Sequence, residues 1–265
     1  MATTHIPTPT PSAHHSTRSM ALNLAEWMSD SLQPFGVQTY FDDGFWWRKP
    51  GGSGIYLGAL NLDTQADNTA RLADLQRVKA AWGGEEFSLY DCWGTYDLSV
   101  GGFERVVQNP WYLRPAGELA TGDYQLPAGL SVARVATVAE LSEFERASWV
   151  GFEESEEMLD SRPPFSWHPA ATVENPNMHY LVARFAGQVV AGVIVQTSAD
   201  MLGIYGLSTL PAFRRRGYAT ALIRAAVALR PDLPACVFPD PPSVPIYTPL
   251  GFVVAGEIAI WQRKQ

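Results

Sequence analysis

A basic bend at residues 214–217, which read Arg-Arg-Arg-Gly, limits most strongly what this chain can fold into. The apolar run before it, residues 201–207, is typical of a buried strand. After the bend, residues 219–226 carry apolar side chains at the spacing of one helix face. The sequence therefore predicts a strand that turns directly into a helix. The first turn of such a helix leaves N–H groups without acceptors, and these groups and the helix dipole favour an anion.

The residues of the bend match a known signature. Arg214-x-x-Gly217-x-Ala219 resembles the Arg/Gln-x-x-Gly-x-Gly/Ala motif of the GNAT superfamily of acyl-CoA N-acyltransferases. Gly217 has no Cβ, so a ligand can approach the backbone closely there. In that family the amides of this loop hold the pyrophosphate of coenzyme A. The resemblance implies that acetyl-CoA is bound by Arg215, Arg216, Gly217, Tyr218, Ala219 and Thr220.

A second motif lies downstream, at residues 240–252. It resembles the family's closing motif, Asn-x-x-Ala/Ser-x-x-x-Tyr-x-x-x-Gly-Phe, with Ser243, Tyr247 and a Gly-Phe pair in register. Asp240 stands where the family usually has Asn, which puts that residue's contact with the pantetheine arm in doubt. Prolines at 245 and 249 predict that the helix around Tyr247 is short or broken.

The resemblance implies a catalytic role for Tyr247, which would protonate the departing thiolate. A phenol with a pKa of about 10 can give a proton to a thiolate whose acid has a pKa of about 8.5. The alternative is a core tyrosine with a satisfied hydroxyl. The resemblance also implies that the pantetheine arm pairs with the strand before the bend, at Ser208, Thr209 and Leu210.

The base that takes the proton from the amine is not identified by the sequence. The acidic run after residue 152 is expected to face the acceptor, with Glu153 and Glu154 as substrate-binding residues. Glu156 and Glu157 belong to the same run, and a solvated acidic surface is the alternative for each of the four. His168 and His179 are weaker candidates.

Composition shifts divide the chain. We expect a disordered leader at 1–19, a degenerate GNAT-like N-terminal domain at 20–113, a linker at 114–130 and an acetyl-CoA-binding GNAT domain at 131–265. The N-terminal part repeats the spacing of the C-terminal part weakly, without the arginine-glycine bend. The fold class predicted is mixed α/β, with a mostly antiparallel central sheet flanked by helices. The aromatic cluster at residues 40–47 is read as sheet core or as a wall for a substrate.

The net charge of −8 argues against nucleic acid as the main partner and fits a cationic amine acceptor. The two cysteines have no metal-type spacing, so we expect no metal and a reduced, cytoplasmic protein. No apolar run is long enough to span a membrane. Three functions remain open: an acetyl-CoA-dependent N-acetyltransferase acting on a small molecule or peptide, a non-catalytic acetyl-CoA sensor of the same fold, and an interaction protein.

Overall fold

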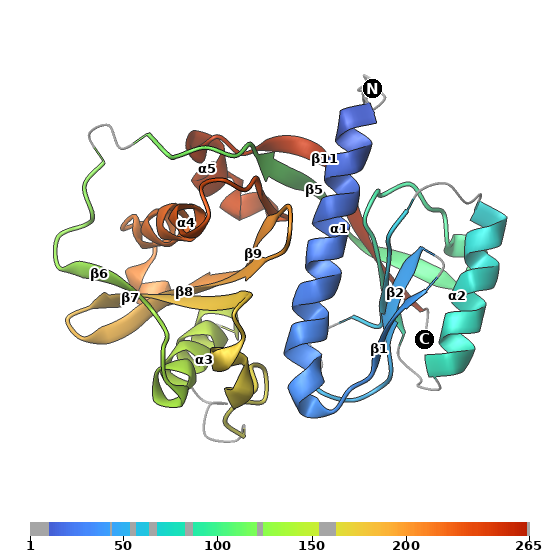
Figure 1. The fold of residues 1–265 in the computed structure, drawn as a ribbon, viewed down its shortest axis with the longest axis horizontal. Helices are drawn as coiled ribbons and strands as arrows, with labels where there is room; N and C mark the ends of the chain where they lie inside the picture. Colours follow the sequence, from blue (N-terminus) through green and yellow to red (C-terminus); the bar gives the residue numbers. More distant parts are fainter. Residues whose placement is uncertain are drawn as a thin grey trace.

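The computed structural model describes residues 11–42, 44–53, 57–63, 68–82, 87–120, 124–153 and 163–263. Its strands form one sheet of 11 strands, in the order β1-β2-β3-β4-β11-β5-β10-β9-β8-β7-β6. Most neighbouring strands are antiparallel, and helices pack on the sheet (Figure 1). The predicted fold class, a mixed α/β fold with a mostly antiparallel sheet, is confirmed.

The N-terminal half forms one end of this sheet. Its elements are β1 (Thr39–Asp42), β2 (Phe45–Arg48), β3 (Ala59–Asn61), α2 (Asn68–Trp82), β4 (Ser88–Asp91) and β5 (Phe103–Arg114). The C-terminal half forms the other end. Its elements are β6 (Leu130–Arg134), α3 (Val138–Glu153), β7 (Met178–Phe185), β8 (Gln188–Thr197), β9 (Leu202–Thr209), α4 (Tyr218–Leu229), β10 (Ala235–Val237), α5 (Val244–Tyr247) and β11 (Val253–Arg263).

The two halves exchange their last strands. β5 pairs with β10 of the C-terminal half, and β11 pairs with β4 of the N-terminal half. β5 and β11 also pair with each other, from Phe103 opposite Arg263 to Leu113 opposite Val253. In Figure 1 these two long strands cross between the halves. Neither half has a complete sheet without the other.

The strand order supports the internal duplication expected from the sequence. Outward from the central pair, β4, β3, β2 and β1 on one side mirror β10, β9, β8 and β7 on the other. In each half, one parallel pair is connected through a helix: β3 and β4 through α2, and β9 and β10 through α4. Gly102 and Gly251, with φ of 79° and 84°, precede the two exchanged strands at equivalent places. Between Arg114 and Leu130 the described residues form no helix or strand, and the division into two domains stays a prediction.

The first helix corrects the expected disordered leader. α1 spans Pro11–Leu32, so residues 11–19 are helical, and Thr17 and Ser19 are buried. The expectation was wrong for this part, while residues 1–10 lie outside the described residues. Few side chains at 11–19 are apolar, so local composition hides a helix that tertiary contacts stabilise.

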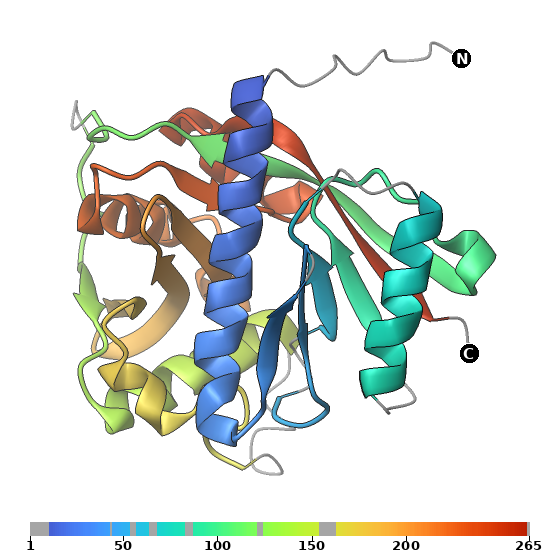
Figure 2. The same ribbon diagram turned by 45° about the vertical axis from the view of Figure 1, so that its right-hand side comes forward.

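α1 lies across the junction of the two halves (Figures 1 and 2). Its buried residues, such as Leu24 and Met28, join one cluster with Trp46 of the N-terminal half and Tyr205 of the C-terminal half. The Asn23 amide donates to the carbonyl oxygens of Gln196 and Met201, which fixes the helix on the β8–β9 turn. Within the described part of the chain, no helix is long and apolar enough to cross a membrane.

Candidate active site

The sheet opens between β9 and β10. These parallel strands pair only at Leu202 with Ala235 and at Gly203 with Cys236, and the rest of β9 has no pairing with β10. β9 also bulges against β8, since Gly192 lies opposite Ser208 but Ile194 lies opposite Tyr205. The bulge contains Gly206, whose φ of 58° is in the left-handed region. This side of β9 therefore offers backbone groups to a ligand rather than to a neighbouring strand.

The basic bend follows at the end of β9, as predicted. Arg215 and Gly217 both have left-handed φ values, 64° and 80°. The first helical bond of α4 runs from the Ala221 N–H to the Gly217 carbonyl oxygen. In the described residues no acceptor faces the N–H groups of residues 215–220. The bend is exposed, so these donors are open to an anion at the positive end of the helix dipole.

Two arginines of the bend make different hydrogen bonds. Arg214 donates to the carbonyl oxygens of Thr209 and Gly151, at 3.2 Å and 2.9 Å, and so ties the bend to the end of α3. Arg216 donates to the Ala212 carbonyl oxygen and its guanidinium lies over the Phe213 ring. The bend is thus held in shape by its own side chains, while its N–H groups point to the outside.

Tyr247 is buried at the end of α5, and its ring packs edge-on against Phe252 at 5.5 Å. Burial, and then the nearby charge of Asp240, raise the pKa of Tyr247. Its hydroxyl is therefore protonated at neutral pH. The Asp240 carboxylate accepts a 3.4 Å hydrogen bond from the amide of Asn109, which comes from β5 of the other half. α5 has four residues and continues as a 3₁₀ turn, which confirms the short, broken helix predicted from the prolines.

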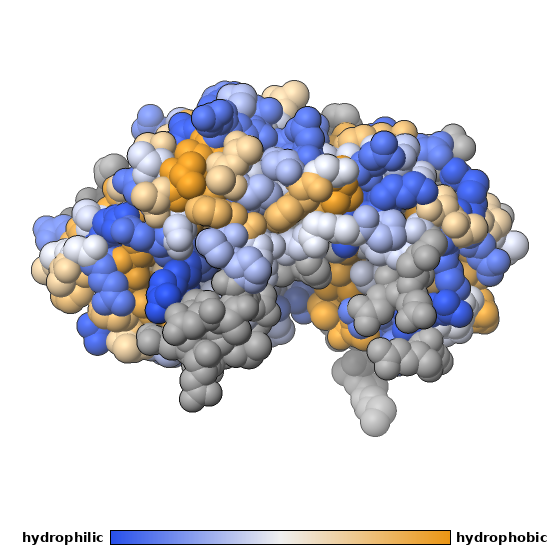
Figure 3. Space-filling view, turned by 90° about the horizontal axis from the view of Figure 1, so that it is seen from below, coloured by the Kyte–Doolittle hydropathy of each residue, from blue (hydrophilic) through white to orange (hydrophobic). Residues whose placement is uncertain are grey.

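A cavity of about 480 Å³ lies at the opening of the sheet. Asp240, Ser243 and Tyr247 line it, together with Gly206 and Leu207 of the bulge. The N-terminal half contributes Tyr90 and Asn109, and α1 contributes Trp27. Seen from below, the molecule is hollowed between its two lobes (Figure 3).

His168 forms part of the cavity wall and is itself buried. Burial lowers its pKa to about 3, so its imidazole is neutral, and its Nδ1 has no partner among the described residues. The loop that carries it is fixed by Glu145 of α3, whose carboxylate accepts the backbone N–H groups of Phe165, Trp167 and His168. Among the residues that the structure describes, no group of three or more His, Cys, Asp or Glu could hold a metal ion.

The comparisons with known proteins agree with this geometry. The model of the acetyltransferase (GNAT) family matches residues 138–252, which include the bend, β9, β10 and Tyr247. This part of the chain belongs to the GNAT superfamily. The family supports acyltransferase activity for the domain. No curated protein sequence matches the chain.

Three solved structures share the fold along almost the whole chain. A GCN5-related N-acetyltransferase from Kribbella flavida has a TM-score of 0.63 and 19% identity, covering 91% of this chain and 96% of its own. A functionally unknown conserved protein from Staphylococcus epidermidis has a TM-score of 0.61 and 12% identity, covering 87% and 95%. A protein from Novosphingobium aromaticivorans, described as an acetyltransferase from the GNAT family, has a TM-score of 0.50 and 16% identity, covering 92% and 99%.

The predicted site residues of this GNAT domain fall into two places. Asp240, Ser243 and Tyr247 lie together in the cavity wall. The N–H groups at the start of α4 lie on the exposed bend, and the Tyr218 side chain is buried, so that residue offers only its backbone. Glu154, Glu156 and Glu157 lie outside the described residues, as does the side chain of Glu153, whose backbone ends α3.

The three residues expected to pair with the pantetheine arm differ from one another. Leu210 donates its N–H to the Val190 carbonyl oxygen of β8, so this group is already used. Because strand groups alternate in direction, the N–H of Thr209 points to the open side of β9. The Ser208 side chain is buried and its hydroxyl lies 3.5 Å from that of Ser148. Thr209 is therefore the best placed of the three.

No motif in the sequence points to Trp27, Tyr90 and Asn109, which line the cavity. They lie far from both motifs in the sequence, and only the strand exchange and α1 bring them to the GNAT site. The bulge had one local signal, Gly206 inside an apolar strand. His179, considered as a base, is half-buried on β7 and is not among the cavity residues described.

The equivalent opening of the N-terminal half is closed by a side chain. Asn61 at the end of β3 accepts the Cys92 N–H at 2.6 Å and donates to the Asp91 carboxylate at 3.2 Å. Both Asn61 and Asp91 are fully buried. The amide thus fills the place between β3 and β4 that corresponds to the open side of β9.

Proposed function

We propose that this protein transfers an acetyl group from acetyl-CoA to a primary amine of a small molecule or peptide, by direct attack in a ternary complex. The observation that carries the proposal is the exposed bend, where the N–H groups of residues 215–220 meet no acceptor in the described chain. A helix N-terminus with several open donors fits a diphosphate. The strand before the bend, β9, contributes Gly206 and Leu207 to the cavity wall, which Tyr247 also lines.

The co-substrate would extend from the bend toward the cavity. Its pyrophosphate would lie on the N–H groups of residues 215–220, and its pantetheine arm would pair with the open side of β9 at Thr209. Asp240 and Ser243 line the wall where the thioester would lie. Acetyl-CoA serves here as a co-substrate, and the reaction needs no metal.

The chemistry follows from these positions. The amine nitrogen attacks the thioester carbonyl, a C–N bond forms, and a backbone N–H at the β9 bulge stabilises the oxyanion. The C–S bond then breaks, the nitrogen releases its proton to solvent water, and Tyr247 gives its phenolic proton to the thiolate. Holding the amine and the thioester together supplies much of the rate, so few catalytic side chains are required.

A sensor that binds acetyl-CoA without turnover is the second candidate. Burial, and then the negative charge of Asp240, raise the pKa of Tyr247 and make the phenol a weaker acid toward the thiolate, which favours this candidate. The two functions share the bend and differ only in turnover.

Two measurements on the full chain test the proposal. Thermal unfolding with excess acetyl-CoA is expected to show stabilisation, because a ligand that binds only the folded state raises the melting temperature. Release of free thiol with a panel of primary amines is expected for the transferase and not for the sensor. If acetyl-CoA does not stabilise the protein, both the transferase and the sensor function are contradicted.

A further inference from the structure

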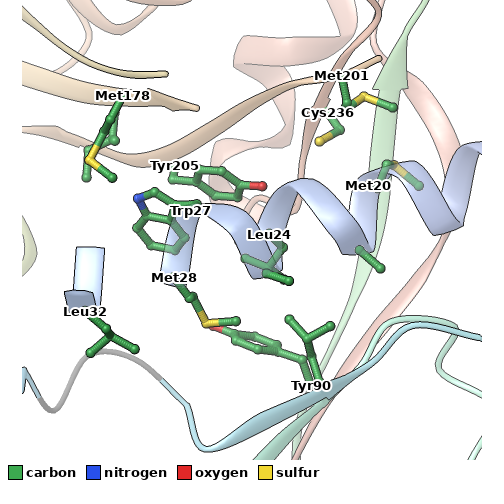
Figure 4. Packing of buried hydrophobic residues seen from close by; sticks show 14 of the residues in the cluster. Met20, Leu24, Trp27, Met28, Leu32, Tyr90, Met178, Met201, Tyr205 and Cys236 are labelled. Carbon is green, nitrogen blue, oxygen red and sulfur yellow. The ribbon is translucent and has the colours of Figure 1, made fainter. Parts of the chain in front are cut away.

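The wall of the cavity contains many aromatic rings. Six of its rings come from α1, β4, α3, β9 and the segments after α3 and β10: Trp27, Tyr90, Phe152, Trp167, Tyr205 and Phe238. Trp27 stacks on Tyr205 with ring centroids 4.3 Å apart (Figure 4), and Phe238 lies edge-on to Tyr90 at 5.8 Å. Phe152, also in the wall, packs on Trp167 at 6.3 Å. Such a lining favours a ring in the acceptor.

Charge in the wall is sparse. Of the lining residues in the described chain, Asp240 is the one with a formal charge at neutral pH. Its carboxylate is paired with Asn109 and lies close enough to Tyr247 to raise that pKa, so it belongs to the part of the wall next to the sulfur. A cationic acceptor, which the net charge of −8 led us to expect, finds no dedicated anionic partner among the described wall residues.

Among the wall residues that the structure describes, groups that could take a proton are also scarce. The buried imidazole of His168 is uncharged and, with a pKa of about 3, accepts a further proton poorly at neutral pH. Tyr247 already carries its proton. An alkylamine with a pKa of about 10.4 is neutral in only about one molecule in 2,500 at pH 7. An amine whose nitrogen is attached to an aromatic ring is mostly neutral at that pH and needs no base before it attacks.

We infer that the acceptor is an aromatic amine, which enters the cavity uncharged and is held by its ring between the aromatic walls. The inference depends on the proposed transferase function and names its acceptor class. The nitrogen would be the attacking atom, and its proton would leave to solvent after the C–N bond has formed.

The test compares two isomers, p-toluidine and benzylamine, which contain the same atoms and differ in whether the nitrogen is on the ring. Thiol release with acetyl-CoA is measured for both and for spermidine. We expect kcat/KM at pH 7 to be at least 10-fold higher for p-toluidine than for either other amine. Between pH 6.5 and 9 the value for p-toluidine should stay flat, while that for benzylamine rises about 10-fold per pH unit. A preference for spermidine, or a flat profile with benzylamine, would overturn the inference and leave the transferase function intact.

A matched pair of variants tests the ring contact. Phe152 lines the cavity and is 50% exposed, while Phe41 on β1 is 53% exposed and is not a cavity residue. Phe152→Ala should raise KM for p-toluidine at least fivefold, and Phe41→Ala should leave it unchanged; equal KM values for both would contradict the contact. Calorimetric titration of p-toluidine into CoA-saturated protein measures the affinity of the cavity for the amine without turnover. If no amine releases thiol, the transferase proposal fails, and the titration decides whether the cavity binds an aromatic amine.

Discussion

Gly217→Glu tests the bend most directly. The substitution places a carboxylate next to the open N–H groups of residues 215–220. We expect it to abolish or strongly weaken acetyl-CoA binding, since the new anion occupies the donors and repels the diphosphate. The effect of the substitution on folding has to be measured apart from its effect on binding, and a second glycine with a similar φ provides the control.

The folding cost comes from the backbone. Gly217 has a φ of 80°, and a Cβ there would meet Pro127 Cγ at 3.5 Å, an ordinary contact. A side chain in the left-handed region costs about 1–2 kcal/mol, or about 2–8 °C of melting temperature for a chain of this size. Gly187 in the β7–β8 turn has a φ of 83° and open space around its Cβ position. Gly187→Glu should therefore lose a similar stability at a position outside residues 214–220.

The binding cost comes from charge. Two unit charges about 4 Å apart repel by about 1 kcal/mol in water and about 4 kcal/mol at an effective dielectric of 20. This corresponds to an affinity loss of about 5-fold to 1,000-fold. With acetyl-CoA at about 100 times its Kd, the wild-type chain gains about 2.7 kcal/mol. The variant would gain between about 1.8 kcal/mol and nearly nothing at the same concentration.

Thermal unfolding with and without acetyl-CoA measures both effects. We expect the two glutamate variants to unfold at similar temperatures without ligand. With ligand, Gly187→Glu should keep the wild-type stabilisation and Gly217→Glu should lose a third or more of it. The reasoning is refuted if Gly217→Glu is stabilised by acetyl-CoA as strongly as the wild type.

Three further predictions concern the rest of the site and the core. Tyr247→Phe should bind acetyl-CoA normally and lower kcat by about 10²–10⁴-fold in thiol release; an unchanged kcat would remove Tyr247 from the mechanism. Burial lowers the pKa of His168 from 6.5 to about 3, so the unfolded chain binds the proton more tightly and stability falls as the pH drops below 6.5. Denaturant titrations should show a loss of about 2 kcal/mol between pH 7 and pH 5 that is absent in His168→Gln; equal losses would contradict this assignment. Leu24→Ala should reduce the free energy of unfolding by about 2–5 kcal/mol because the residue is fully buried where α1 meets both halves, whereas Leu126→Ala, at a 46% exposed position, should change it by less than about 0.5 kcal/mol.

Much of the C-terminal half could be predicted because its signals are local. The helix after the bend was expected from the apolar spacing at residues 219–226, and α4 spans Tyr218–Leu229. Ala186-Gly187 was expected to form a hairpin, and both residues have positive φ values between β7 and β8. The two prolines around Tyr247 gave the short helix. In each case a few neighbouring residues fix the backbone.

The helix at residues 11–19 could not be predicted, because its stabilising contacts are not local. Residues 11–19 have few apolar side chains, and their helix is stabilised from a distance: the Ser19 hydroxyl, for example, donates to Asp200, 181 positions away. No local sequence pattern predicts a contact between residues so far apart in the chain. The same holds for Asn109, which reaches Asp240 only because β5 is exchanged into the other half.

The sequence by itself determined the exposed basic bend, since unpaired donors at a helix start follow from residues adjacent in the chain. It also determined the family, the order of the elements in the C-terminal half and the position of Tyr247. Only the tertiary structure decided what lines the cavity. The cavity wall is assembled from α1, β4, β5 and the loop of His168, and these segments meet through strand exchange and core packing, which depend on contacts between residues far apart in the chain.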